Sequence, residues 1–234
     1  MNKFLKTMKI FTQLMNNNLK LKFSNKTLDG RNNSVLNENE VKKEIFSEEF
    51  QSILKDYGII VNDGGGRKLA DIALTFKKLK VFNFDVNIKV ISQKSANNNL
   101  NNSLTLLNLI FFNEPEIIHR KPFYEKMVSN CFSNIENDYG ILEIIKETGE
   151  CFGSTLLTRE DLITNPSNGF QCSYNHKKEV PDKTFEEGRE FFLNKFIELQ
   201  LKIVIPVLKF LLSKCPERVI NEIGTINGKK LNFF

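Results

Sequence analysis

One aspartate and a short run of acid, amide and lysine have the residue types that metal-assisted chemistry on a phosphate needs. Asp71 lies in one strand-like run, and Asp85, Asn87 and Lys89 occupy alternate positions of the next. Because side chains alternate between the two faces of a strand, the last three share one face, and the apolar residues between them share the other. If the two runs pair, Asp71 approaches Asn87 and Lys89. Oxygen ligands beside a lysine, on rigid strands, suit a hard divalent cation and a phosphate.

Hydrolysis of a phosphodiester requires a polarised phosphate, a positioned water and stabilisation of developing negative charge. We expect Asp71 to be the principal metal ligand. Asn87 could give its carbonyl oxygen to the metal or an N–H to the phosphate, and Lys89 would hold the attacking water or the scissile phosphate. Asp85, on the same face as Asn87, is a supplementary metal ligand in this interpretation.

Two β-strands and a preceding helix must position these side chains. The strands are expected over residues 67–76 and 81–91, joined by a tight lysine-rich turn. Residues 38–57 have apolar positions at helical spacing, and Gly58 is a natural helix stop. Glu44 or Glu48 of this helix could add a carboxylate to the site, although such acids more often line a solvated helix face.

The rest of the chain predicts further helices and strands in alternation. A capping box, Thr184 to Glu187, opens a long amphipathic helix that extends to about Lys214. The other expected elements are a helix over residues 1–22, a loop to residue 37, a buried helix over 100–112, strands over 139–146, 151–157 and 170–174, and a helix cap at 158–161. This mixture predicts an α/β fold with a central mixed β-sheet flanked by helices.

The length of 234 residues and an apolar content of 41% fit one domain with a substantial core. We divide it into an N-terminal basic helix or arm (1–36), a catalytic core (37–112), and the remaining sheet with the C-terminal helix (113–234). The first 26 residues are basic and lack acids. They could form a helix on the core, a basic arm on DNA, or an organelle transit peptide.

Charge and cysteine content narrow the class of protein. The net charge of +5 permits binding to a polyanion without requiring it. The four cysteines form no CxxC pair and the two histidines offer no zinc spacing, so reduced thiols are the simpler interpretation. No segment approaches the roughly 20 apolar residues of a membrane span. We therefore expect a cytoplasmic protein without a membrane partner.

The spacing of the candidate residues is similar to that of a known nuclease family. Asp71, then fifteen intervening residues, then Asn87-Ile-Lys89 resembles the PD-(D/E)xK signature in the variant where an amide replaces the second acid. The amino-acid sequence of residues 66–74, 86–90 and 94–98 is similar to that of small bacterial type II restriction endonucleases. Ala70 stands where the motif has proline. The resemblance is specific over about residues 64–98.

The resemblance implies a restriction-endonuclease-like fold, Mg²⁺-dependent cleavage of double-stranded DNA, and a homodimer on a palindromic site. Within such a protein the DNA contacts are expected from a glycine-rich turn, from the polar loop after the second strand, and from a basic loop. The residues are Arg67, Lys94, Asn97, Asn98 and Lys177. Each of these segments could instead be an ordinary solvated turn or loop.

The sequence thus favours a sequence-specific DNA endonuclease of a restriction-modification system that uses Asp71, Asn87 and Lys89 with Mg²⁺. An alternative is a non-enzymatic nucleic-acid-binding or structural protein, such as an organelle ribosomal component. A third hypothesis is a repair or recombination nuclease of the same fold, which would cut by DNA structure.

Overall fold

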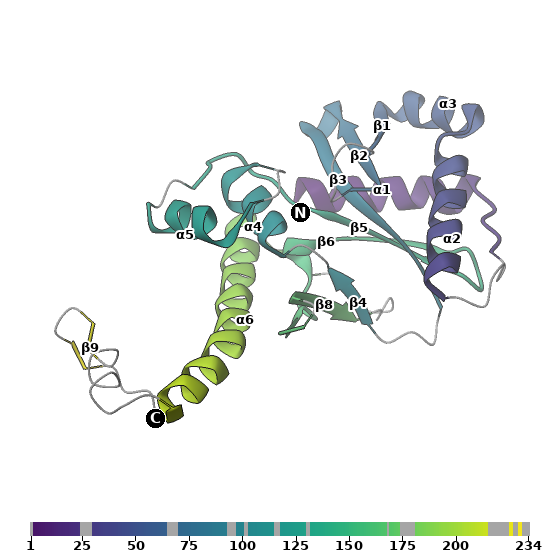
Figure 1. The fold of residues 1–234 in the computed structure, drawn as a ribbon. Helices are drawn as coiled ribbons and strands as arrows, with labels where there is room; N and C mark the ends of the chain where they lie inside the picture. The colour runs from purple at the N-terminus through teal and green to yellow at the C-terminus, as the bar shows by residue number, and fades with distance from the viewer. Residues whose placement is uncertain are drawn as a thin grey trace.

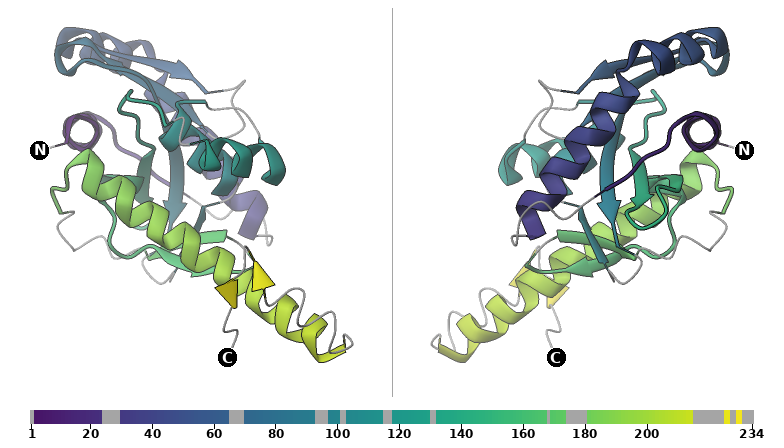
Figure 2. Two further views of the ribbon diagram at one scale, coloured as in Figure 1. Left: turned by 90° about the vertical axis from the view of Figure 1, so that its left-hand side faces the viewer. Right: turned by 90° about the vertical axis from the view of Figure 1, so that its right-hand side faces the viewer.

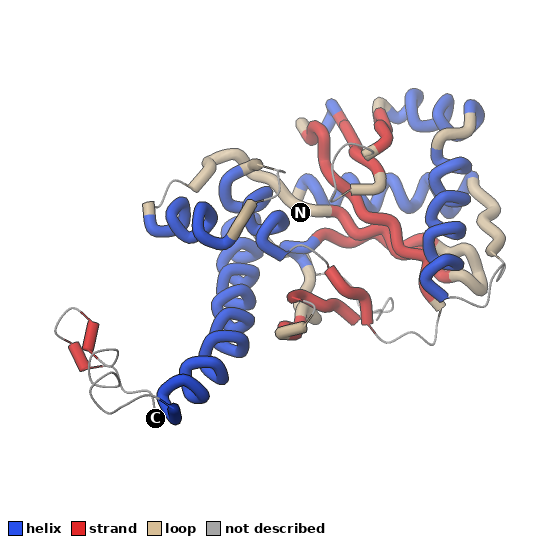
Figure 3. Tube along the Cα trace, viewed as in Figure 1, coloured by secondary structure: helices blue, strands red, loops and turns tan. Residues whose placement is uncertain are grey.

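The chain folds around a five-stranded mixed sheet with the strand order β1-β2-β3-β5-β6. The structure is a computed structural model that describes residues 2–23, 30–64, 70–92, 97–100, 103–114, 118–129, 132–167, 169–173, 181–214, 225–226 and 229–230. The central strands are β1 Ile59–Asp63, β2 Ile72–Phe76, β3 Val81–Ile91, β5 Gly140–Ile145 and β6 Cys151–Thr155. Strands β3 and β5 are parallel, and the other neighbours are antiparallel. The predicted α/β class and central mixed sheet are confirmed, and Figure 3 shows the strands in red between the helices.

Helices lie on both sides of this sheet. They are α1 Lys3–Asn18, α2 Gly30–Ile45, α3 Glu48–Tyr57, α4 Ser103–Phe112, α5 Arg120–Val128 and α6 Phe185–Lys214. Helix α1 lies against one side of the strands (Figures 1 and 2), and its apolar cluster includes Val41 and Ile45 of α2. Helices α4 and α6 pack with Ile141, which is on the other side of β5. Three short strands, β4 Asn97–Leu100, β7 Ile163–Asn165 and β8 Gly169–Ser173, form a second sheet, and β9 Thr225–Ile226 pairs with β10 Lys229–Lys230.

The helical region before β1 differs from the prediction. The expected single helix over residues 38–57 is two helices, and α2 begins at Gly30, within the segment expected to be a loop. Ser47 causes the break, because it is extended and its side chain accepts a hydrogen bond from the Phe50 N–H as the N-cap of α3. Gly58 ends α3 in the left-handed conformation, as predicted.

The hairpin of β2 and β3 forms where the sequence predicts it. A single 3-10 turn, η1 Lys77–Leu79, connects the two strands, and Ile72 lies opposite Val86 in the antiparallel register. The first strand is shorter than expected: it begins at Ile72, and residues 65–69 are outside the described part of the chain.

The side of the sheet that faces α1 is apolar. Phe84, Val86 and Ile88 of β3 are fully buried and form a hydrophobic cluster with α1. The Phe84 ring lies 5.1 Å from the ring of Phe4, centroid to centroid. Gly153 on β6 allows α1 to lie close, because a Cβ there would be 2.9 Å from the Met8 carbonyl oxygen. The alternation predicted for β3 is therefore confirmed on this side.

A second apolar cluster lies around the start of β5. It joins Ile141 to α4, α5 and the first half of α6, including Phe192 and Phe196. The capping box of Thr184 and Glu187 opens α6 as predicted. The helix continues through Pro206, and its second half extends away from the rest of the chain (Figure 1) with exposed apolar side chains.

Two smaller expectations are wrong. Residues 158–161 do not cap a helix: Thr155 and Thr158 cap each other across a short 3-10 turn, η2 Leu156–Thr158. The helix expected over residues 100–112 begins at Ser103, and Leu100 ends β4. Among the described residues, no helix combines the length and apolar character needed to cross a bilayer.

Candidate functional site

Asp71 is fixed by hydrogen bonds at the head of β2. Its backbone N–H donates to the Val86 carbonyl of β3 at 3.0 Å, and its own carbonyl accepts from the Gly64 N–H at 3.1 Å. The glycine is needed there, because a Cβ on residue 64 would lie 2.3 Å from the Ala70 carbonyl oxygen. The Asp71 carboxylate turns toward β3, where Oδ2 accepts from the Ile88 N–H at 2.7 Å. Asp71 therefore lies directly beside the segment from Asn87 to Lys89.

Asp85, Asn87 and Lys89 lie on the side of β3 opposite the α1 cluster, as the alternation predicts. Asp85 pairs with Ala73 of β2 and is buried, whereas Asn87 and Lys89 are half-buried. In the parallel register with β5, Asn87 is level with Ile141 and Lys89 is level with Glu143. The sheet thus brings the predicted catalytic residues together at one place, and half-exposure leaves two of them accessible to a substrate.

A carboxylate from helix α2 completes this group. Glu38 Oε1 lies 3.3 Å from Lys89 Nζ, and both side chains are mostly shielded from solvent. The acids that the sequence suggested from this region, Glu44 and Glu48, are exposed instead. The sequence did contain a signal, since Glu38 precedes the core residues Val41 and Ile45 by three and seven positions. Placing the start of the helix at residue 38 hid that pattern.

Tyr139, just before β5, is a further member of the group. Its side chain is buried, and the pairing of β3 with β5 places it on the side of the sheet that carries Asp85 and Asn87. Burial, together with the nearby charges of Asp71 and Asp85, raises the pKa of the Tyr139 hydroxyl well above its usual range. The phenol is therefore neutral, and it stands among two carboxylates and an amide. Sequence reasoning assigned this tyrosine only to the start of a buried strand.

Further polar side chains lie on β5 and β6 and in the segment after β6. Glu143 is buried, and its Oε2 lies 3.4 Å from Nη1 of Arg159. The same guanidinium donates to Ser154 Oγ at 3.1 Å and makes two 2.9 Å bonds to the Asp161 carboxylate. Since a buried carboxylate is costly without partners, Arg159 is what allows Glu143 to lie level with Lys89.

The expected DNA contacts are only partly within the described chain. Arg67, Lys94 and Lys177 lie outside the described residues. Asn97 and Asn98 lie on β4, which pairs with β8 in the second sheet. Strand β4 follows β3 in the sequence, whereas β7 and β8 come after the last strand of the central sheet. These five DNA contacts stay predictions.

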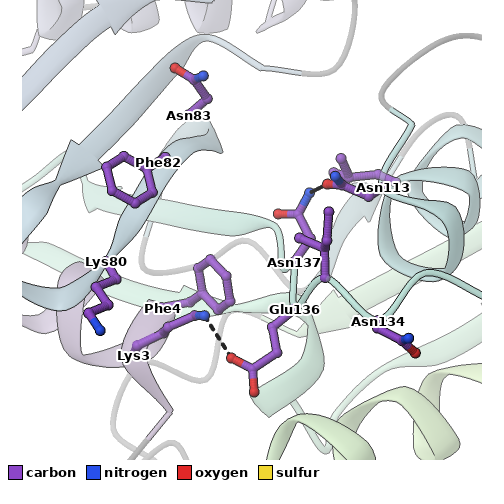
Figure 4. Close-up of a pocket in the computed structure, with 11 residues that line it drawn as sticks. Lys3, Phe4, Lys80, Phe82, Asn83, Asn113, Asn134, Glu136 and Asn137 are labelled. Carbon is purple, nitrogen blue, oxygen red and sulfur yellow. Dashed lines mark hydrogen bonds and ion pairs between the residues drawn. The ribbon is translucent and has the colours of Figure 1, made fainter.

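A separate cavity of about 660 Å³ lies at the other end of β3. Figure 4 shows it between the start of α1, the turn before β3 and residues 134–137. Its polar side chains are largely engaged with one another: Lys3 pairs with Glu136, and Asn137 donates to Asn113. It includes none of the predicted catalytic residues.

The donor set fits a magnesium ion that also binds a phosphate. Mg²⁺ is typically held by one or two carboxylates, with water and substrate oxygens completing an octahedron. Asp71 and the carbonyl of Asn87 are suitable oxygen donors, with Asp85 beside them. The described residues contain no cluster of three or more His, Cys, Asp or Glu side chains of the kind that forms a closed metal site.

A scan against models of protein families finds no match, and a search of curated proteins finds no similar sequence. The functional interpretation therefore depends on the residues and their geometry.

Proposed function

We propose that this protein is a Mg²⁺-dependent, sequence-specific endonuclease of the restriction type that hydrolyses double-stranded DNA. The observation that supports it most is the position of the Asp71 carboxylate. It is bonded to the backbone between Asn87 and Lys89, while Lys89 pairs with Glu38 of the covering helix. Side chains from α2, from the head of β2 and from β3 thus form one polar, partly accessible group.

The polar group is difficult to explain as a stabilising feature. Burial of carboxylates and a lysine costs desolvation energy, and apolar residues of similar volume would commonly stabilise as well or better. Departures of this kind from simple packing are expected at functional sites. This argument favours an enzyme over a structural nucleic-acid-binding protein.

Each residue has a distinct task in the proposed reaction. Asp71 and the carbonyl of Asn87 would hold the cation, with Asp85 as a supplementary ligand, and Lys89 would stabilise the attacking water and the negative phosphate. Glu38, at 3.3 Å, keeps the Lys89 ammonium oriented. Mg²⁺, when bound, would polarise the phosphate and offset its charge. Water adds its oxygen to phosphorus, one bridging P–O bond breaks, and the departing oxygen gains a proton.

The test is digestion of DNA with the purified chain, with Mg²⁺ and with EDTA. Long amplified DNA is the best substrate because it lacks the methylation that would protect a restriction site. We expect a fixed set of bands with Mg²⁺ and intact DNA with EDTA. DNA binding without cleavage would support the non-enzymatic alternative, and cuts only at branched or nicked structures would support a repair nuclease.

A matched pair of lysine variants ties the activity to the site. Lys89→Ala should reduce cleavage by a factor of about 10²–10³ or more while DNA binding survives. Lys77→Ala, in the exposed turn before β3, removes the same charge elsewhere in the hairpin and should cut normally. Full cutting by the Lys89 variant would remove this residue from the mechanism. Cleavage of both strands by a homodimer stays a prediction. Gel filtration with and without DNA measures the oligomeric state that it requires.

A further inference from the structure

We propose that the cavity at the start of β3 binds a nucleotide, with the base against the exposed ring of Phe82 and the phosphate beside Lys80. The cavity volume of about 660 Å³ is within the range of roughly 300–1,000 Å³ that is common for ligand pockets. Because the cavity contains none of the predicted catalytic residues, this inference does not depend on DNA cleavage.

The cavity lies where the two apolar clusters of the molecule meet. Phe4 of α1 belongs to the cluster under β3, and Leu109 of α4 belongs to the cluster around Ile141. Both side chains line the cavity and are almost completely buried, so they give it an apolar floor. Figure 4 shows α1, β3 and residues 134–137 around this space. Ligand sites commonly occur at junctions of this kind.

A β-bulge in β3 leaves the Phe82 ring exposed at the cavity. In a regular strand Phe82 and Phe84 would share one side, yet Phe84 is fully buried against α1 and Phe82 is 61% exposed. Between them Asn83 has a left-handed φ of 48°, and the register with β2 shifts between Leu74 and Phe76. A bulge changes the direction of a side chain in this way. The exposed aromatic ring suits stacking of a planar base.

The hydrogen bonds around Asn137 fix one donor for a ligand. Asn137 Oδ1 accepts from the Asp138 backbone N–H at 2.9 Å, so its Nδ2 is the end that donates to Asn113 Oδ1, at 2.8 Å. The NH₂ group of Asn113, which lines the cavity, has no partner among the residues that the structure describes. Such an amide can donate to an acceptor on the edge of a base.

Lys80 supplies positive charge to the same cavity. Lys3 also lines it, but Lys3 Nζ lies 2.7 Å from Glu136 Oε2, so these two charges offset each other. Lys80 is exposed and has no acidic partner within the described part of the chain. The cavity therefore carries a net positive charge, which suits a phosphate.

These groups together match the parts of a nucleotide. The base needs an aromatic surface and hydrogen-bonding groups at its edge, and the phosphate needs a cation. A free nucleotide and an unpaired nucleotide of a DNA strand present the same chemistry to this cavity.

The test measures binding to the full chain by calorimetry in EDTA, which prevents Mg²⁺-dependent cleavage. The probes are deoxynucleoside monophosphates, a short single-stranded oligonucleotide and inorganic phosphate. We expect a nucleotide probe to bind about tenfold or more tightly than phosphate. Binding of the monophosphates would identify a free nucleotide as the ligand, and binding of the oligonucleotide alone would identify an unpaired DNA nucleotide. Equal binding of phosphate, or no binding of any probe, would overturn the proposal.

Matched variants assign the binding to the cavity. Phe82→Ala should weaken nucleotide binding about tenfold, because the stacking surface is lost. Phe210→Ala, 63% exposed on α6, should leave it unchanged. Lys80→Asn removes the charge with a residue that tolerates the left-handed backbone, and should weaken binding about threefold or more. Lys77→Ala, in the exposed turn, is its control.

Asn113→Asp tests the donor group. The carboxylate still accepts from Asn137 but cannot donate to a base, and its charge opposes the phosphate, so binding should fall about tenfold. Urea denaturation of each variant verifies that it is folded. Wild-type affinity in folded Phe82→Ala and Asn113→Asp, or equal losses in the two control variants, would place the nucleotide elsewhere and refute the assignment.

Discussion

The two sides of β3 contrast sharply, although they belong to the same eleven residues. Toward α1, Phe84, Val86 and Ile88 are fully buried in an apolar cluster. On the other side, which carries Asp85, Asn87 and Lys89, the lysine pairs with Glu38 of α2, and the Asp71 carboxylate accepts from the backbone N–H of Ile88. One side supplies the free energy that holds the strand in place, and the other uses that rigidity to hold polar groups at fixed positions. Variants that affect only one side test this division.

The largest effect on stability is expected on the apolar side. Phe84→Ala should lower the free energy of unfolding by about 3–5 kcal/mol, because it leaves a cavity under α1. Phe82→Ala, on the same strand but 61% exposed, is the matched control and should change it by less than about 0.5 kcal/mol. Urea denaturation measures both. Equal effects would show that α1 does not seal this side.

A pH-dependent effect is expected at Asp138, which is completely buried just before β5. Burial raises the pKa of its carboxyl to about 7, although hydrogen bonds from Thr155 and from the Tyr139 and Leu157 N–H groups oppose the shift. Because the folded pKa exceeds the unfolded value, the folded chain retains a proton that the unfolded chain releases. The contribution of Asp138 to stability is therefore greatest below about pH 4 and falls as pH rises to about 7.

Asp138→Asn should remove this dependence, because the amide is neutral at every pH and its oxygen can still accept from the two N–H groups. Relative to this variant, the wild type should lose up to about 4 kcal/mol between pH 4 and pH 7. Thermal or urea unfolding at several pH values measures the difference. Parallel stability profiles for the two proteins would mean that the carboxyl is ionised in the fold throughout.

The buried ion pair of the polar side should show the cost of breaking a charge pair. Arg159→Met leaves the Glu143 carboxylate buried without the guanidinium and should destabilise the chain by about 3 kcal/mol. The double variant Glu143→Gln with Arg159→Met should recover part of that loss. If the double variant were as unstable as the sum of the single ones, packing of the arginine rather than its charge would be responsible.

The smallest effect on stability is expected at Glu38. Glu38→Gln should change the free energy of unfolding by less than about 1 kcal/mol, because the pair with Lys89 is partly solvated. Under the proposed function it should still slow cleavage about tenfold or more, since Lys89 loses its orienting partner. Glu44→Gln, exposed on the same helix, should affect neither property. A normal cleavage rate for the Glu38 variant would limit the site to the strands.

Local pattern was sufficient for much of the fold. The hairpin of β2 and β3 follows from alternation on either side of a short polar turn, and the capping box of Thr184 marks the start of α6. The break at Ser47 was missed because apolar positions at helical spacing continue across it, whereas an N-cap depends on one side-chain hydrogen bond.

The sequence alone placed Asp71 close to the segment from Asn87 to Lys89, because short-range alternation and a tight turn fix the register of the hairpin. Only the tertiary structure decided what surrounds them. Tyr139 and Glu143 reach the site through a parallel pairing of β3 with β5, and Glu38 reaches it through the packing of α2. Contacts between residues some fifty positions apart depend on how whole elements bury their apolar faces, and no local pattern encodes that arrangement.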